Sequence, residues 1–181
     1  MKRVLFFSLM LIGLASCGPS CPEEISEEAK SLVTQFQQEV RLREANGLIA
    51  PDKYATVGIE NAFAFELWVA ETRALLAYDQ VGALAKRFNY PQAMNLYDGS
   101  GKRTTPTPEL TNQILRSEED FCTYYQRFMI EEFKDQMIGN DMVDMMLLEA
   151  PRRVSFNNGQ FQVSKKDVKG REDYKIVFMY N

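Results

Sequence analysis

Cysteines and carboxylates are the side chains of this chain whose types and spacing could do chemistry. The three cysteines are Cys17, Cys21 and Cys122, and the chain of 181 residues contains no histidine. Without histidine there can be no Ser-His-Asp or Cys-His triad, no histidine-ligated zinc and no histidine proton shuttle. What remains is the chemistry of thiols and of acidic side chains, and it depends on the elements that position these residues.

The first cysteine follows a short apolar segment. Two basic residues precede an apolar run from Val4 to Leu14, and Ala15-Ser16-Cys17 come next. This order is typical of a secretory signal. A membrane-spanning helix needs about 20 apolar residues, so the run is too short to cross a bilayer. Residues 1–16 are therefore predicted to be a signal peptide.

The sequence Leu14-Ala15-Ser16-Cys17 resembles the lipobox of bacterial lipoproteins. The resemblance covers the signal alone. It implies that Cys17 is acylated, for example with palmitate, and becomes the mature N-terminus anchored in membrane lipid. Because Gly18 stands where an aspartate would signal inner-membrane retention, the resemblance also implies the outer membrane, facing the periplasm. The alternative is a soluble secreted protein with a cysteine near its cleavage site.

Behind the signal the length predicts one domain, because the 165 remaining residues can form a single core. Residues 17–24 are interpreted as the lipidated N-terminus and a short tether, and residues 25–181 as a single periplasmic domain. Eight extended residues reach at most about 28 Å, so the domain is expected to lie close to the membrane.

Cys21 and Cys122 are the two cysteines left over from the anchor. An even pair in an oxidising compartment predicts a disulfide, which would staple the segment beside the lipid to the middle of the domain. The alternative is two free thiols, with Cys122 buried as a small apolar side chain.

Charge is unevenly distributed along the chain. Without the signal, 19 basic and 25 acidic residues remain, which argues against a nucleic-acid partner because nucleic-acid binding needs a basic face. The C-terminal end is nevertheless basic, and it could contact a protein partner or anionic headgroups. The candidate interaction residues are Arg152, Arg153, Lys165, Lys166 and Lys169. The alternative is that these cations lie on solvated faces.

Glu60, Glu66 and Glu71 are the acid–base candidates. Two carboxylates about 5 to 10 Å apart could hydrolyse a sugar bond of the cell wall. No motif surrounds these glutamates, so surface or ion-paired roles are the stronger interpretation. The glycine-rich loop at 98–101 lacks a calcium or phosphate motif, and a Cu(I) site at the methionines of 142–146 is disfavoured. No cofactor or metal is predicted.

Apolar spacing predicts several helices. The first runs from about Pro22 or Ser26 to Ala45, and a long second one from Ile59 to Phe88. A third has one possible start at 107–108 and another at 117–120, and its strongest helical pattern runs from Phe121 to Met137. A last short helix is expected over 142–149.

The C-terminal end changes to an alternating pattern. Asn158-Gly159 predicts a tight turn that places Phe156 opposite Phe161 and Val154 opposite Val163. A polar turn over 164–173 and a third strand over 174–180 follow. The predicted fold is α+β, with three main helices packed on a small C-terminal three-stranded antiparallel meander, whose exposed edge could accept a partner strand.

These observations predict a lipid-anchored periplasmic binding or assembly module that is not an enzyme, such as an accessory subunit of an envelope or secretion complex. One alternative is an immunity or exclusion lipoprotein that neutralises an incoming effector. Another is a carboxylate-based cell-wall hydrolase that uses Glu66 or Glu71. The oligomeric state does not follow from the sequence.

Overall fold

The structure is a computed structural model, and it describes residues 21–22, 24–94, 114–131, 134–135, 138, 146–149, 152–156, 161–168 and 171–179. The helices in these ranges are α1 (Glu27–Ala45), the 3-10 helix η1 (Ala55–Val57), α2 (Ala62–Ala77), α3 (Val81–Ala85) and α4 (Glu118–Phe128). The strands are β1 (Gln92–Ala93), β2 (Ile114–Leu115), β3 (Met146–Leu148), β4 (Arg153–Phe156), β5 (Phe161–Val168) and β6 (Arg171–Met179).

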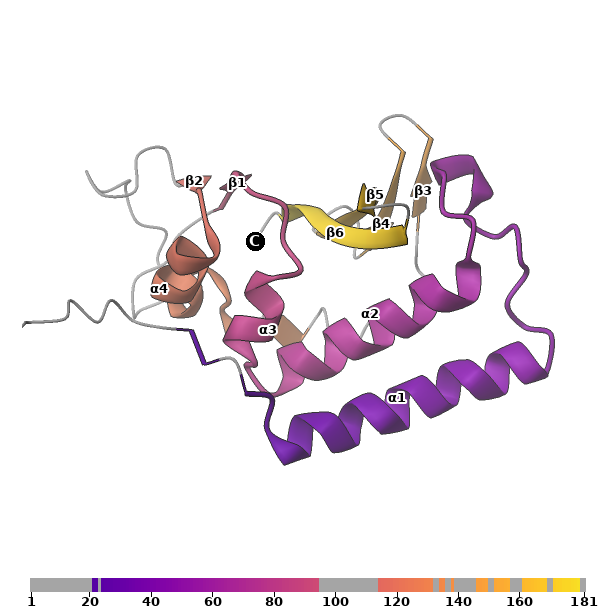
Figure 1. Ribbon diagram of the computed structural model, residues 1–181, viewed down its shortest axis with the longest axis horizontal. Coiled ribbons are helices and arrows are strands. Elements are labelled where there is room, and N and C mark those ends of the chain that lie inside the picture. Colours follow the sequence, from indigo (N-terminus) through magenta and orange to yellow (C-terminus); the bar gives the residue numbers. More distant parts are fainter. Residues whose placement is uncertain are drawn as a thin grey trace, which may run out of the picture.

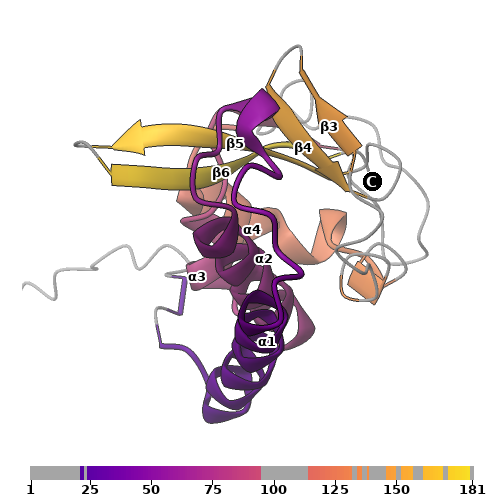
Figure 2. The ribbon, with the colours of Figure 1, turned by 90° about the vertical axis from the view of Figure 1, so that its right-hand side faces the viewer.

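The helix α2 forms the middle layer of the molecule. One side packs against the antiparallel helix α1 and the other side against the sheet, as Figures 1 and 2 show. At the centre the Phe65 ring contacts Tyr54 and Tyr174 edge to face, with centroids 4.9 and 5.1 Å apart. A second aromatic group around Phe121 joins α4 to Phe88. Among the described residues no helix is long and apolar enough to cross a membrane.

Capping residues set both ends of α1. The Ser26 side chain accepts a hydrogen bond from the Ala29 amide at the N-terminus. At the C-terminus Gly47 adopts a φ of 68°, and the Gly47 and Leu48 amides donate to the carbonyls of Glu44 and Arg43. This pair of bonds is a Schellman motif, in which glycine is favoured because it tolerates positive φ. The predicted helix from Ser26 to Ala45 is confirmed.

The predicted helix from Ile59 to Phe88 is wrong as one continuous element. The chain leaves α2 at Tyr78, and Asp79 adopts a φ of 48° before α3 begins at Val81. Apolar spacing runs through this break, but aspartate tolerates the left-handed conformation and turns the chain here. The start also differs, because Asn61 caps α2 by accepting from the Ala64 amide.

The third predicted helix is confirmed only in part. Ser117 caps α4, which matches the second start signal, but α4 ends at Phe128 instead of Met137. Positions 131, 134, 135 and 138 are again helical. Ile114 and Leu115 form β2 and pair with β1, so their assignment to the helix was wrong. The first start signal, at 107–108, lies outside the described residues.

The four-stranded C-terminal sheet has the order β3-β4-β5-β6 and is antiparallel throughout. The mixed class of helix and sheet is confirmed, and so is the predicted register of Phe156 with Phe161 and Val154 with Val163. The three-stranded count is wrong. Residues 146–148 form β3 instead of part of a helix, since a short apolar run fits either element. The rest of the predicted helix, 142–145, and the turn at 157–160 lie outside the described residues.

The predicted polar turn over 164–173 is also wrong, because β5 extends to Val168 and β6 begins at Arg171. Charged residues pair across these strands and replace the apolar alternation that marks a strand in the sequence. One edge of the sheet is paired with the chain beside Phe88, where the Asn89 amide donates to Ile176 and the Ile176 amide donates to Arg87. The other edge strand, β3, carries the exposed Leu147.

Candidate functional site

The two cysteines predicted to pair are brought together in the structure. Cys21 lies just before α1 and Cys122 lies on α4, and they form a disulfide with their Cα atoms 5.6 Å apart. The bridge joins positions separated by 101 residues. It therefore fixes the start of the described chain to the α3–α4 end of the molecule. The predicted acylation site, Cys17, lies outside the described residues.

The chain following Cys21 is docked by two further contacts. A Cβ atom added to Gly82 of α3 would collide with the Pro22 carbonyl oxygen, so only glycine allows this close approach. The Ser26 amide donates to the Gln80 side chain at 2.8 Å, and Gln80 in turn donates to the Tyr78 carbonyl. Pro22 and Ser26 are thus held against α3 and the turn before it.

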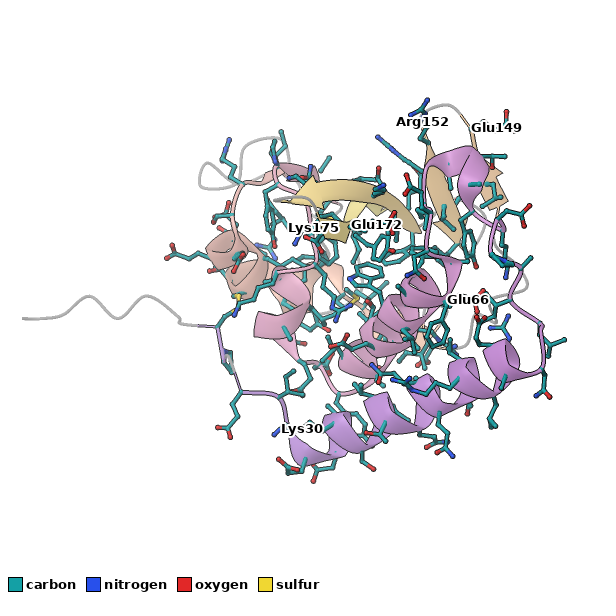
Figure 3. The ribbon with its side chains drawn as sticks, turned by 45° about the vertical axis from the view of Figure 1, so that its right-hand side comes forward. Lys30, Glu66, Glu149, Arg152, Glu172 and Lys175 are labelled. Atoms are coloured by element: carbon teal, nitrogen blue, oxygen red, sulfur yellow. A yellow bond between two sulfur atoms is a disulfide. The ribbon has the colours of Figure 1, made fainter. Side chains whose placement is uncertain are left out.

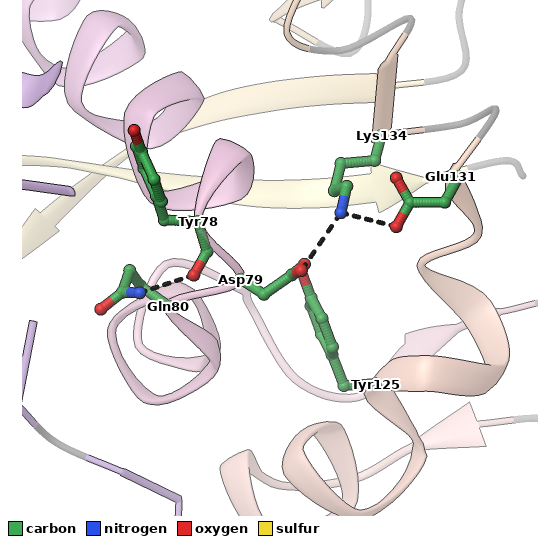
Figure 4. A network of polar contacts seen from close by, with 6 residues as sticks. All are labelled: Tyr78, Asp79, Gln80, Tyr125, Glu131 and Lys134. Atoms are coloured by element: carbon green, nitrogen blue, oxygen red, sulfur yellow. Dashed lines mark hydrogen bonds and ion pairs between the residues drawn. The ribbon is translucent and has the colours of Figure 1, made fainter. Parts of the chain in front are cut away.

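Asp79 is the centre of a polar cluster at the same turn (Figure 4). Its carboxylate accepts hydrogen bonds from the Tyr125 hydroxyl at 2.7 Å and from the Lys134 amine at 3.1 Å. Lys134 also pairs with Glu131 at 2.8 Å. Burial raises the pKa of Tyr125, so the phenol stays protonated and keeps donating. These bonds hold the turn to α4. In the sequence, the only sign of this turn is the polar pair Asp79-Gln80 within an otherwise apolar pattern.

The candidate acid Glu66 is fully buried and has three partners. Its carboxylate accepts from Arg43 of α1 at 2.7 Å, from Lys53 at 3.0 Å and from the Tyr54 hydroxyl at 3.0 Å. Figure 3 shows Glu66 between the helices. Burial raises the pKa of Tyr54, and the nearby carboxylate raises it further. The arrangement joins α1, the chain before η1 and α2, and it leaves the carboxylate no access to a substrate.

The other candidate acid, Glu71, is partly exposed and ion-paired. Arg87 contacts its carboxylate at 2.8 Å and stacks over the Trp68 ring at 5.0 Å. Arg87 also donates to the Thr72 hydroxyl at 2.7 Å. Glu71 therefore helps to hold Arg87 against α2, which is a structural role.

The predicted basic residues are divided between separate places. Lys165 points toward α2 and pairs with Glu172 at 3.0 Å, whereas its neighbour Lys166 points to the other face and donates to Asn89. Arg153 donates to the Gln162 side chain. Arg152, labelled in Figure 3, is exposed at the start of β4. Lys169 lies outside the described residues, so the described cations do not form one patch.

A groove opens where the C-terminal end of α1, the N-terminal end of α2 and the strand β6 meet. Its volume is about 540 Å³, and we call it the α2 groove. The lining residues are Glu44, Ile49, Pro51, Glu60, Asn61, Ala62, Phe63, Ala64, Glu172 and Tyr174. Sequence reasoning missed this site because its two walls come from segments more than 100 residues apart, joined by a bond from the Glu60 amide to Glu172.

Glu172 organises one wall of the α2 groove. It accepts from Lys165, from the Tyr174 hydroxyl at 2.8 Å and from the Glu60 amide at 3.1 Å. Burial acts to raise the pKa of Glu172, but these hydrogen bonds outweigh it and lower the pKa below the usual value. The wall therefore keeps its negative charge at neutral pH. Within the described ranges, no group of three or more His, Cys, Asp or Glu side chains is arranged to hold a metal ion.

Comparisons with known proteins give no further indication of function. No protein-family model matches the chain, and no curated protein and no solved structure matches it significantly. The functional argument therefore rests on the geometry described above.

Proposed function

We propose that this chain is a lipid-anchored binding or assembly module of the bacterial cell envelope. In this proposal acylated Cys17 holds the chain on the outer membrane, and the domain binds a protein partner in the periplasm. An accessory subunit of an envelope or secretion complex fits this description.

The observation that carries the proposal is the fixed N-terminal segment. Cys21 is bonded to Cys122 only four positions after the lipobox cysteine, and Pro22 packs against Gly82. Four extended residues span about 14 Å at most, so an acyl anchor at Cys17 would hold the α3–α4 end at the membrane. Secreted and periplasmic proteins keep disulfides, which agrees with an envelope location.

Labelling with radioactive palmitate tests the anchor. Wild-type protein is expected to take up label and to remain with the membrane fraction, and Cys17→Ala is expected to abolish both. The matched control is Ser20→Ala, which changes a neighbouring residue and keeps both the lipobox and the disulfide. Label that survives Cys17→Ala would overturn the proposal.

The alternative hypothesis, an immunity or exclusion lipoprotein, is favoured by one observation, the exposed carboxylates at the starts of α1 and α4. Glu27, Glu28, Glu118 and Glu119 are all exposed and would suit a basic effector. Pull-down from cross-linked envelopes separates the two readings. A stoichiometric envelope subunit indicates assembly, and capture only after a cognate effector is added indicates immunity.

The hypothesis of a carboxylate-based cell-wall hydrolase has less support. Burial and two cationic partners leave the Glu66 carboxylate unavailable, and Glu71 is held by Arg87. Incubating purified peptidoglycan with the wild type and with Glu71→Gln tests what remains of this reading. Release of sugar fragments by the wild type and not by the variant would revive it.

A further inference from the structure

One exposed apolar side chain, Leu48, stands next in the chain to Ile49, which lines the α2 groove. Leu48 is 64% exposed and follows the C-terminal end of α1. Leu48 is not in a loose segment, because its amide is bonded to the Arg43 carbonyl in the turn that ends α1. A single exposed leucine is ordinary on a protein surface, so Leu48 gains significance only from the groove next to it.

The α2 groove itself has apolar side chains in its walls. The chain after Leu48 contributes Ile49 and Pro51 to one wall, and Phe63 and Tyr174 line the opposite side. A volume of about 540 Å³ lies within the range of binding pockets, roughly 300 to 1,000 Å³. It could take one or two side chains of a partner.

Charge indicates which side chains would enter. Glu44, Glu60 and Glu172 line the groove, and Glu44 has no ion-pair partner among the residues that the structure describes. Glu60 is largely exposed, and its contact with Lys165 is a long one of 3.7 Å. Arg43 and Lys53 also lie near this end of α1, but both pair with Glu66, and Arg41 lies over the Phe63 ring at 6.0 Å. The residues that line the groove include three carboxylates and no basic side chain, so the groove favours a positively charged group.

The groove lies at the end of the molecule away from the disulfide. Figure 1 shows the chain entering beside α3 and α4, whereas the C-terminal end of α1 and the N-terminal end of α2 lie at the opposite end of the long axis. If the anchor holds the first end at the membrane, the groove faces away from the bilayer. A partner in the periplasm could then reach it.

We propose, on the basis of the proposed function above, that the α2 groove with Leu48 is the surface that binds the protein partner. The occupant is a segment of the partner in which a lysine or arginine stands between apolar residues. Its cation lies between Glu44 and Glu60, and its apolar neighbours cover Leu48 and the groove wall.

A blocked tripeptide tests the chemistry of this surface. The probe is acetyl-Leu-Lys-Leu-amide, titrated into the mature chain carrying Cys17→Ser and followed by amide chemical shifts in NMR. Shifts are expected along residues 42–64 and at Glu172, and acetyl-Leu-Glu-Leu-amide is expected to leave them unchanged. Equal responses to both peptides, or no response in these residues, would overturn the proposal.

Substitutions locate the binding. Glu44→Gln with Glu60→Gln is expected to weaken binding about twofold to fivefold for each carboxylate, as for exposed ion pairs. Leu48→Ser is expected to weaken it about tenfold. The matched control is Glu28→Gln with Glu39→Gln, which removes two exposed carboxylates of α1 outside the groove. If the control variant weakens binding as much as the Glu44 and Glu60 substitutions do, the peptide is attracted by the overall negative charge, and the groove is not its binding site.

Photo-cross-linking in cells connects the surface to the partner. A photoreactive residue at Leu48 is expected to cross-link to a different protein, and one at the exposed Tyr78 is the control. Cross-linking at Tyr78 alone would contradict the proposed binding surface but not the proposed binding function. A cross-link to a second copy of the chain would contradict the proposal of a different protein as partner and indicate self-association. No cross-link at any exposed position would count against the binding function itself.

Discussion

The α3–α4 end and the α2 groove end of this molecule differ in how firmly the chain is held and in what is exposed to solvent. At the α3–α4 end a disulfide, a close glycine contact and the Asp79 cluster hold the chain at several points. At the groove end Glu44 and Leu48 are exposed to solvent. The first arrangement resists separation of the chain from the domain, and the second leaves groups for another molecule. One end thus fits attachment and the other fits recognition.

Among the changes that test this comparison, removing the disulfide should lower the free energy of unfolding most. Cys21→Ser with Cys122→Ser opens a loop of about 100 residues, which is expected to cost about 4 kcal/mol of unfolding free energy. Urea unfolding of the oxidised wild type and of the variant measures the loss. The reduced wild type is the control and should match the variant. Equal stability of all three would show that the bridge does not constrain the chain.

Glu66→Gln should have the next largest effect, because it removes the charge that faces Arg43 and Lys53. Breaking a buried ion pair costs about 3 to 5 kcal/mol. Both cations are about a third exposed and can turn toward water, so we expect the lower end of this range. Glu71→Gln is the control, since its partly exposed pair with Arg87 should be worth at most about 1 kcal/mol. Urea unfolding that ranks the two variants in the opposite order would contradict the assignment.

Gly82→Ala tests whether the close contact between Gly82 and the Pro22 carbonyl contributes to the stability of the fold. An alanine in a helix interior normally stabilises by about 0.5 to 1 kcal/mol relative to glycine. Here the added Cβ meets the Pro22 carbonyl, so we expect a loss of about 1 to 2 kcal/mol in thermal or urea unfolding. In the variant without the disulfide the loss should shrink, since Pro22 can then move away from α3. A gain in stability in the wild-type background would disprove the contact.

Local patterns predicted the elements that local residues determine. The register of Phe156 with Phe161 followed from alternation around an Asn-Gly turn, and α1 followed from the spacing of its apolar residues. The cysteine pairing followed because only two cysteines remained after the anchor. In each case the signal lies in the residues of the element itself or in a simple count.

Long-range contacts determined what the sequence could not predict. The break at Asp79 is held by Tyr125 of α4, while the apolar spacing continues through it. The strand β3 forms because β4 is available to pair with it, whereas its own short apolar run fits a helix equally well. The α2 groove exists only after residues 60 and 172 meet. Neither the spacing of apolar residues nor the charge in the two segments indicates that they come into contact.

The smallest expected effect concerns pH and the groove wall. The pKa of Glu172 is lower in the folded protein than in the unfolded chain, because Lys165, Tyr174 and the Glu60 amide donate to the carboxylate. The folded state therefore binds its proton only at lower pH, and the stabilisation is complete above the ordinary glutamate pKa of 4.5. It is lost as the pH falls through the folded value. Glu172→Gln should flatten this part of the curve of unfolding free energy against pH by less than about 1 kcal/mol, because the site is partly exposed. Parallel curves for the wild type and Glu172→Gln would mean that the groove wall does not hold this carboxylate in its charged form.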